Sequence, residues 1–151
     1  MVRREFLLRG SGLLAALVAA GWLSPEAAAQ EWNRAAFEAK SIKEALEALG
    51  AKDASAGADI VITAPEIAEN GAVVPITVAS RIAGTESIAL LADKNPSALS
   101  GVFTFPVGTL PEVHTRVKLA ETSNVHVLVR AGGKFAFATK EIKVTLGGCG
   151  G

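Results

Sequence analysis

Residues 58–146 contain short runs in which apolar and polar residues alternate, and this feature limits the possible folds most strongly. Alternation places every second side chain on the same face of a β-strand. We expect about seven strands, in the segments ADIVITA, VVPITVAS, ESIALLA, VFTF, EVHTRVKLAE, NVHVLVRA and KFAFATKEIKVTL. Turn-forming residues separate these runs, and no helical pattern lies between them. The sequence therefore predicts a mainly β fold, an immunoglobulin-like antiparallel β-sandwich.

The alternation also predicts which side chains face the core. In four runs the apolar residues that share one face are expected to point inward: Val74, Ile76 and Val78; Val113, Val117 and Leu119; Val125, Val127 and Val129; Ile142, Val144 and Leu146. Pro75 interrupts the run VVPITVAS. Because proline has no N–H to donate to a neighbouring strand, Pro75 predicts an edge strand or a bulge.

Residues 30–57, which precede the sandwich, are expected to form a short N-terminal helical segment. Ser41 and Glu44 have the S-x-x-E spacing of a capping box. An apolar face follows at helical spacing, and Gly50 supplies the C-terminal stop. Trp32 and Phe37 are expected in a preceding turn or short helix that packs onto the domain.

The first 29 residues have the pattern of an export signal that is cleaved from the mature chain. Arg3 and Arg4 precede an apolar stretch of roughly 14 residues, which is too short to span a membrane. Ala27 and Ala29 then form an A-x-A cleavage pattern. The adjacent arginines favour the twin-arginine route over general secretion, and both deliver the protein to the periplasm without a membrane anchor.

Composition excludes several classes of function. The formal net charge is zero, so the chain lacks the basic surface expected of a nucleic-acid-binding protein. The two histidines, His114 and His126, each alternate with apolar residues and are expected on the surface. Without a nearby third ligand they do not predict a metal site. No catalytic residues and no cofactor motif can be identified, and a protein without turnover of its own is expected.

The single cysteine, Cys149, lies between two pairs of glycines at the C-terminus: Gly147 and Gly148, then Gly150 and Gly151. An unpaired cysteine in an exported protein indicates a reactive thiol or an intermolecular disulfide. Glycines add no bulk and leave the backbone free. Residues 147–151 therefore predict a thin, flexible arm whose thiol is an attachment point. The alternative is a frayed terminus with an incidental cysteine.

Together, the paired arginines, PEIAENGAVVPITV, LADKNP, RVKLAETSNV and the terminal GGCGG make the chain resemble the SoxY family over essentially its whole length. The resemblance implies a carrier of sulfur intermediates in periplasmic thiosulfate oxidation, with the sulfur bound covalently to Cys149. It further implies a heterodimer with SoxZ and transient contacts with the cytochrome complex SoxAX and the hydrolase SoxB. In some organisms the sulfane dehydrogenase SoxCD is a further partner.

Two other functions remain open. Ubiquitin-like sulfur carriers also end in Gly-Gly and use the terminal carboxylate, although the leader and the absence of a helix between strand pairs oppose this interpretation. The chain could instead be a β-sandwich assembly module that Cys149 joins to another chain by a disulfide.

Overall fold

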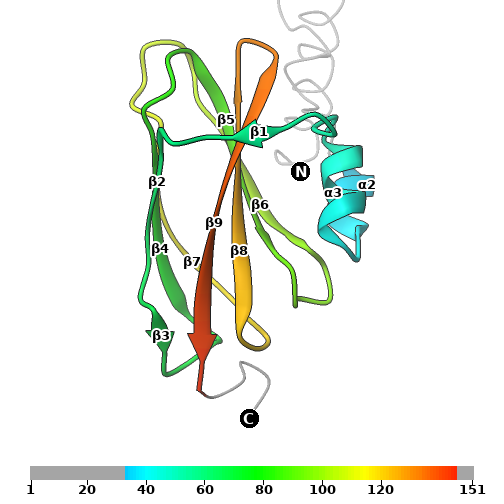
Figure 1. Cartoon of the computed structure of the whole chain (residues 1–151), viewed down its shortest axis with the longest axis vertical. Helices are drawn as coiled ribbons and strands as arrows, with labels where there is room; N and C mark the ends of the chain where they lie inside the picture. Colours follow the sequence, from blue (N-terminus) through cyan, green and yellow to red (C-terminus); the bar gives the residue numbers. More distant parts are fainter. Residues whose placement is uncertain (1–32, 146–151) are drawn as a thin grey trace, which may run out of the picture. The chain divides into compact units, whose positions relative to one another are not determined.

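The computed structural model describes residues 33–145, which form two short helices and two facing β-sheets (Figure 1). The helices are α2 (Arg34–Glu38) and α3 (Ile42–Ala48). One sheet has the order β1-β9-β8-β5-β6, with β3 pairing on β9, and the other has the order β2-β4-β7. The strands are β1 (Ser55–Ala56), β2 (Ile60–Thr63), β3 (Ile67–Ala68), β4 (Val74–Ser80), β5 (Thr85–Ala92), β6 (Leu99–Thr104), β7 (Glu112–Val117), β8 (Ser123–Ala131) and β9 (Lys134–Val144).

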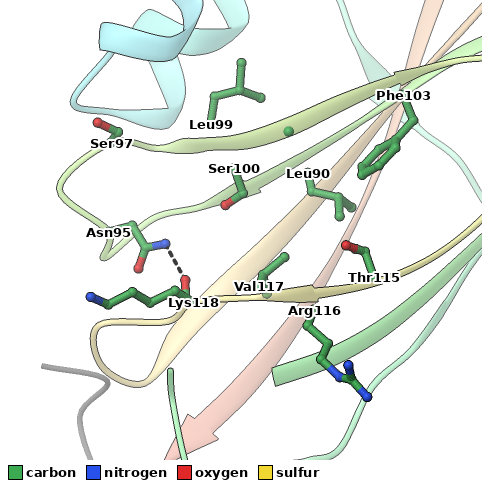
Figure 2. Close-up of a pocket in the computed structure, with 11 residues that line it drawn as sticks. Leu90, Asn95, Ser97, Leu99, Ser100, Phe103, Thr115, Arg116, Val117 and Lys118 are labelled. Carbon is green, nitrogen blue, oxygen red and sulfur yellow. Dashed lines mark hydrogen bonds between the residues drawn. The ribbon is translucent and has the colours of Figure 1, made fainter. Parts of the chain in front are cut away.

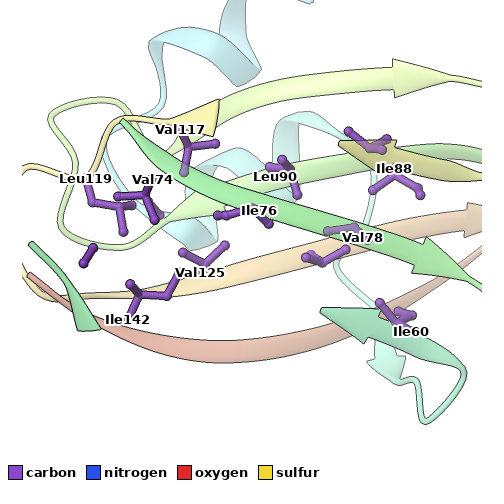
Figure 3. Close-up of a cluster of buried hydrophobic side chains, with 14 of the residues drawn as sticks. Ile60, Val74, Ile76, Val78, Ile88, Leu90, Val117, Leu119, Val125 and Ile142 are labelled. Atoms are coloured by element: carbon purple, nitrogen blue, oxygen red, sulfur yellow. The ribbon is translucent and has the colours of Figure 1, made fainter. Parts of the chain in front are cut away.

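The predicted β-sandwich is thus confirmed, and the seven longer strands coincide with the seven alternating runs. Inward side chains of both sheets meet in one apolar cluster (Figure 3). Ile76 and Val78 from the smaller sheet pack with Leu90, Val127 and Ile142 from the larger one, and each is at most 1% exposed. Burying such a side chain contributes about 1.5–3 kcal/mol, so this cluster is what holds the sheets together.

A second cluster lies between the two helices and the larger sheet. Ala36 and Ala45 on the helices are fully buried, and they pack in the same cluster as Leu91, Leu99 and Leu128 on the strands. Small side chains allow the helices to approach the strands closely. The helical segment thereby belongs to the same packed domain as the sandwich.

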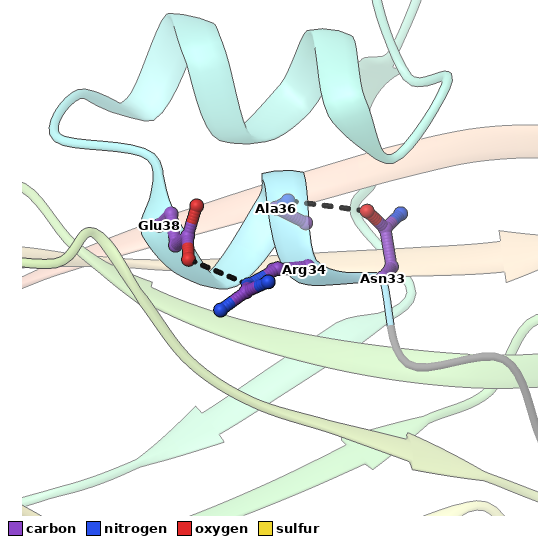
Figure 4. A network of polar contacts seen from close by, with 4 residues as sticks. All are labelled: Asn33, Arg34, Ala36 and Glu38. Carbon is purple, nitrogen blue, oxygen red and sulfur yellow. Dashed lines mark hydrogen bonds and ion pairs between the residues drawn. The ribbon is translucent and has the colours of Figure 1, made fainter.

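Polar contacts define where the helices begin. The side chain of Asn33 accepts from the N–H of Ala36 at 3.1 Å and donates to the carbonyl of Ala48 at 2.9 Å, linking the start of α2 to the end of α3. Arg34 and Glu38 form an exposed ion pair one turn apart (Figure 4). The N–H of Glu44 donates to Ser41 Oγ, as the predicted capping box requires.

One detail of the capped region differs from the prediction. The Glu44 carboxylate accepts from the N–H of Lys40 and not from that of Ser41, so the box is shifted by one residue. The chain between α2 and α3 is extended at Ala39 (ψ 132°), so Phe37 lies in a short helix that precedes the capped one, as predicted. The predicted stop at Gly50 is present, with φ +74°.

The helical segment was expected to continue to residue 57, yet residues 55–56 form β1, which pairs in parallel with β9. The equally short β3 also pairs in parallel with β9. Two-residue strands carry no alternation that a sequence pattern could reveal. Their positions depend on where the rest of the fold brings the chain back beside β9.

Pro75 does not mark an edge strand, because β4 is the central strand of its sheet. That prediction was wrong for the strand as a whole. The pairing with β2 covers only Thr77–Ser80, whereas β7 pairs along Val74–Ala79. At Pro75 the strand therefore has a neighbour on one side only, and the missing N–H leaves no gap in a ladder.

Within residues 33–145, no helix has the length and apolar character needed to cross a membrane.

Candidate functional site

The residues to which the sequence assigns function lie outside the part of the chain that the structure describes. These are Arg3 and Arg4 of the leader, and Cys149 with Gly147, Gly148, Gly150 and Gly151 at the C-terminus. The structure does describe the place from which the C-terminal segment leaves the domain. That place is the end of β9, at Val144 and Thr145.

One edge of the β9 end is bound by β3 and the residues beside it. The N–H of Lys143 donates to the carbonyl of Glu66 at 2.9 Å, and the N–H of Thr145 donates to that of Ala68 at 3.1 Å. These are the bonds of a short parallel ladder. The backbone is therefore fixed as far as Thr145.

The other edge is completed by a side chain. Strand β8 begins at Ser123, opposite Ile142, so no strand residue faces Val144 on that side. Instead, the N–H of Val144 donates to Oγ1 of Thr122, at 3.0 Å. The hydroxyl of Thr122 extends the ladder by one bond beyond the strand. Sequence reasoning missed this residue, because an exposed threonine in a turn carries no signal of its own.

A further hydrogen bond joins the two loops that flank β9. The N–H of Leu119, after β7, donates to the carbonyl of Gly71 at 2.7 Å. The loop around Gly71 is itself ordered by Asn70, whose side chain accepts from the N–H of Ala72 at 2.9 Å. The chain turns at Gly71 and Ala72, directly after Asn70.

The two histidines lie on different sheets. His114 Nδ1 is 3.0 Å from Thr77 Oγ1, and its Nε2 is 2.6 Å from a carboxylate oxygen of Glu112. All three residues lie on the outer face of the smaller sheet, and His114 is exposed. This hydrogen-bonded row of a hydroxyl, an imidazole and a carboxylate resembles a catalytic triad. Catalysis by a triad also needs hydrogen-bond donors that stabilise an oxyanion. The contacts of these three residues supply none.

His126 is half-buried, unlike the surface position expected from the sequence. Its Nδ1 lies 3.0 Å from Thr139 Oγ1. Burial disfavours the charged imidazolium and lowers the pKa of His126 below 6.5, while the negative charge of Asp93 opposes this shift. Among the described residues, no three His, Cys, Asp or Glu side chains are grouped so as to hold a metal ion.

A hollow of about 290 Å³ opens between the edge strands β6 and β7 (Figure 2). Its apolar lining includes Leu90, Phe103 and Val117, and Gly101 leaves room on the β6 side. Arg116 borders the hollow, yet Figure 2 shows its side chain directed away from Leu90 and Phe103. The charge of Arg116 is therefore not focused on the hollow, and the uncharged polar side chains of Asn95, Ser97, Ser100 and Thr115 line it beside the apolar ones.

Comparison with known proteins gives a family and a structure. Residues 45–149 match the family model described as "Sulfur oxidation protein SoxY", and this range ends at Cys149. The structure of the sulfur carrier protein SoxY from Chlorobium limicola f thiosulfatophilum is 40% identical, with a TM-score of 0.65. That match covers 76% of this chain and 100% of the other.

A human F-spondin reeler domain is 10% identical over 60% of this chain and 92% of its own length, with a TM-score of 0.40. No match was found among curated protein sequences. The family match spans more than half of the chain, and the 40% identical structure is covered along its full length. The chain therefore belongs to the SoxY family of sulfur oxidation proteins.

Proposed function

We propose that this protein is a covalent carrier of sulfur intermediates in thiosulfate oxidation, with Cys149 as the attachment point. The observation that carries the proposal is the family match, which runs through the whole sandwich and ends on the chain's single thiol. The 40% identical Chlorobium protein is named a sulfur carrier. The glycines on both sides of Cys149 support a swinging arm, because glycine adds no side chain and restricts the backbone least.

The chemistry at Cys149 balances as an oxidation followed by a hydrolysis. Loading joins the thiol to the sulfane sulfur of thiosulfate, RSH + S₂O₃²⁻ → RS–S–SO₃⁻ + H⁺ + 2e⁻. The two electrons go to a redox partner, for which we propose the cytochrome complex SoxAX. Hydrolysis by SoxB then breaks the S–S bond to the sulfonate, RS–S–SO₃⁻ + H₂O → RS–S⁻ + SO₄²⁻ + 2H⁺. The carrier itself contributes the thiol and no turnover.

The proposal includes a place and partners for the carrier. Arg3 and Arg4 support export to the periplasm by the twin-arginine route, which also transports a partner bound to the folded chain. We propose SoxZ as the permanent partner in a heterodimer. SoxAX, SoxB and, where present, the sulfane dehydrogenase SoxCD bind transiently and exchange the cargo.

The length of the arm sets how close these enzymes must come. Cys149 is four residues beyond Thr145 in the chain, so the two Cα atoms are at most about 14 Å apart. An enzyme that receives the thiol must therefore approach the β9 end of the sandwich. A cofactor on the carrier is not required, because the sulfur is bound directly to the side chain.

The fold weighs against a ubiquitin-like carrier. In this chain α2 and α3 precede the strands and pack on the outer face of the larger sheet. The ubiquitin-like fold instead places a helix between strand pairs. A carboxylate adduct on Gly151 is nevertheless an outcome that experiment distinguishes. So is a disulfide between two copies of Cys149.

The experiment is mass spectrometry of the mature protein purified from thiosulfate-grown cells, with and without reductant. We expect sulfur-containing adducts on the peptide that contains Cys149, removable by reductant and missing from Cys149→Ser. An adduct on the Gly151 carboxylate would establish the ubiquitin-like alternative. A protein isolated only as a Cys149-linked dimer, without thiosulfate-derived sulfur, would establish the assembly module.

A further inference from the structure

Three segments meet where β9 ends, and each is hydrogen-bonded to the other two. The loop after β3 is bonded to the β7–β8 connection through the Leu119 N–H and the Gly71 carbonyl, at 2.7 Å. That connection is bonded to β9 through Thr122 Oγ1 and the Val144 N–H, at 3.0 Å. Strand β9 is bonded back to β3 through the Thr145 N–H and the Ala68 carbonyl, at 3.1 Å. We call this closed set of three hydrogen bonds the β9 clamp.

The clamp holds successive residues of β9 from opposite edges. Lys143 and Thr145 donate toward β3, while Val144 donates toward Thr122. Two of the three links in the clamp join backbone to backbone. The Thr122 link uses a side chain, which makes it the one that a substitution can remove without altering the path of the main chain.

We propose that Thr122 is a positioning residue for the carrier arm, because its hydroxyl holds Val144 on the edge opposite β3 and so helps to fix the strand end from which the arm leaves. This inference rests on the proposed carrier function. Thr122 touches neither cargo nor reacting atoms and acts through Val144. The clamp ends at Thr145. Four residues follow it up to and including Cys149, which carries the thiol.

The expected size of the effect follows from the number of free residues. Full release of Val144 and Thr145 would lengthen the part of the chain that follows the last held residue, counted up to Cys149, from four residues to six, 144–149. The effective concentration of a tethered group falls roughly as the −3/2 power of tether length, so the loss is at most about twofold and reaches that value only when release is complete. This loss of effective concentration slows delivery of the thiol to an enzyme. The reactivity of the thiol toward a small reagent is unaffected.

The test compares Thr122→Val, which keeps the shape of the side chain and removes the hydroxyl, with Thr122→Ser, which restores it. Thr63→Val is a matched control, since Thr63 is exposed on β2 and its hydroxyl makes no hydrogen bond within residues 33–145. Each variant is prepared as the mature chain in complex with SoxZ. Amide hydrogen exchange at Val144, alkylation of Cys149 and thiosulfate loading by SoxAX are then measured.

In Thr122→Val we expect Val144 exchange to accelerate by roughly fivefold, as loss of one net hydrogen bond implies. Loading at subsaturating carrier should slow, by at most about twofold, through a higher KM, with alkylation unchanged. Thr122→Ser and Thr63→Val should behave as wild type. Unchanged exchange at Val144, or faster exchange with unchanged loading, would overturn the positioning role. If the wild-type complex exchanges slowly at Val144 but is never loaded, the carrier function fails and the positioning role in loading fails with it.

Discussion

The close approach of Gly57 to the larger sheet gives a stability test that the sequence alone does not suggest. Gly57 follows β1, and its N–H donates to the carbonyl of Phe137 at 2.9 Å. A Cβ added at Gly57 would lie 3.0 Å from Ala136 Cβ and 3.0 Å from Ile60 Cδ1. The Ile60 side chain can rotate, whereas Ala136 Cβ is attached directly to the β9 backbone.

We therefore expect Gly57→Ala to destabilise the protein. Forcing an extra carbon into a packed site costs about 1–3 kcal/mol. Replacing glycine by alanine offsets about 0.4–1 kcal/mol of this by reducing the entropy of the unfolded chain. The net loss is about 1.5 kcal/mol, and the melting temperature should fall by roughly 4–6 °C.

Gly101→Ala is the matched control, because it makes the same chemical change within a strand of the same sheet. A Cβ at Gly101 would lie 3.5 Å from the nearest atom, on the Phe103 ring, which is an ordinary contact. Its free energy of unfolding should be unchanged or higher by about 0.4–1 kcal/mol. Urea denaturation followed by circular dichroism measures both variants. Equal stability of the two alanine variants would refute the close-approach argument.

Three further predictions concern pH, export and delivery. The pKa of His126 is lower in the folded chain than in the unfolded chain. Below pH 6.5 the unfolded state therefore binds more protons, and the free energy of unfolding decreases as the pH is lowered. His126→Gln should weaken that fall in urea denaturation, and an unaltered pH profile would contradict it. Arg3→Lys with Arg4→Lys should retain the precursor in the cytoplasm, as fractionation and immunoblotting would show; normal export would indicate the general secretion route. Gly148→Val should keep the melting temperature and alkylation of the Cys149 thiol but slow enzymatic loading, since a β-branched side chain restricts the arm; loading at the wild-type rate would exclude a role for Gly148 in access.

Much of the sandwich could be predicted because a half-buried strand records its own orientation in sequence. Val74, Ile76 and Val78 alternate with exposed or half-buried residues, and the structure buries all three. The turn at Gly132-Gly133 also has a local cause, since both residues have positive φ in the β8–β9 hairpin, a conformation that glycine adopts readily. These features are local, so a short window of residues contains the whole physical cause.

For the candidate site, the sequence and the tertiary structure each determine a different part. The sequence alone singles out Cys149 between its glycines as the chemically distinctive feature, because thiol chemistry and backbone freedom are properties of residue types. Tertiary structure alone decided how the end of β9 is held. The bonds from Val144 to Thr122 and from Thr145 to Ala68 join residues far apart in the chain. The two-residue pairing of β3 with β9 and the single hydroxyl of Thr122 produce no periodic pattern in the sequence. Only the folded chain therefore reveals these contacts.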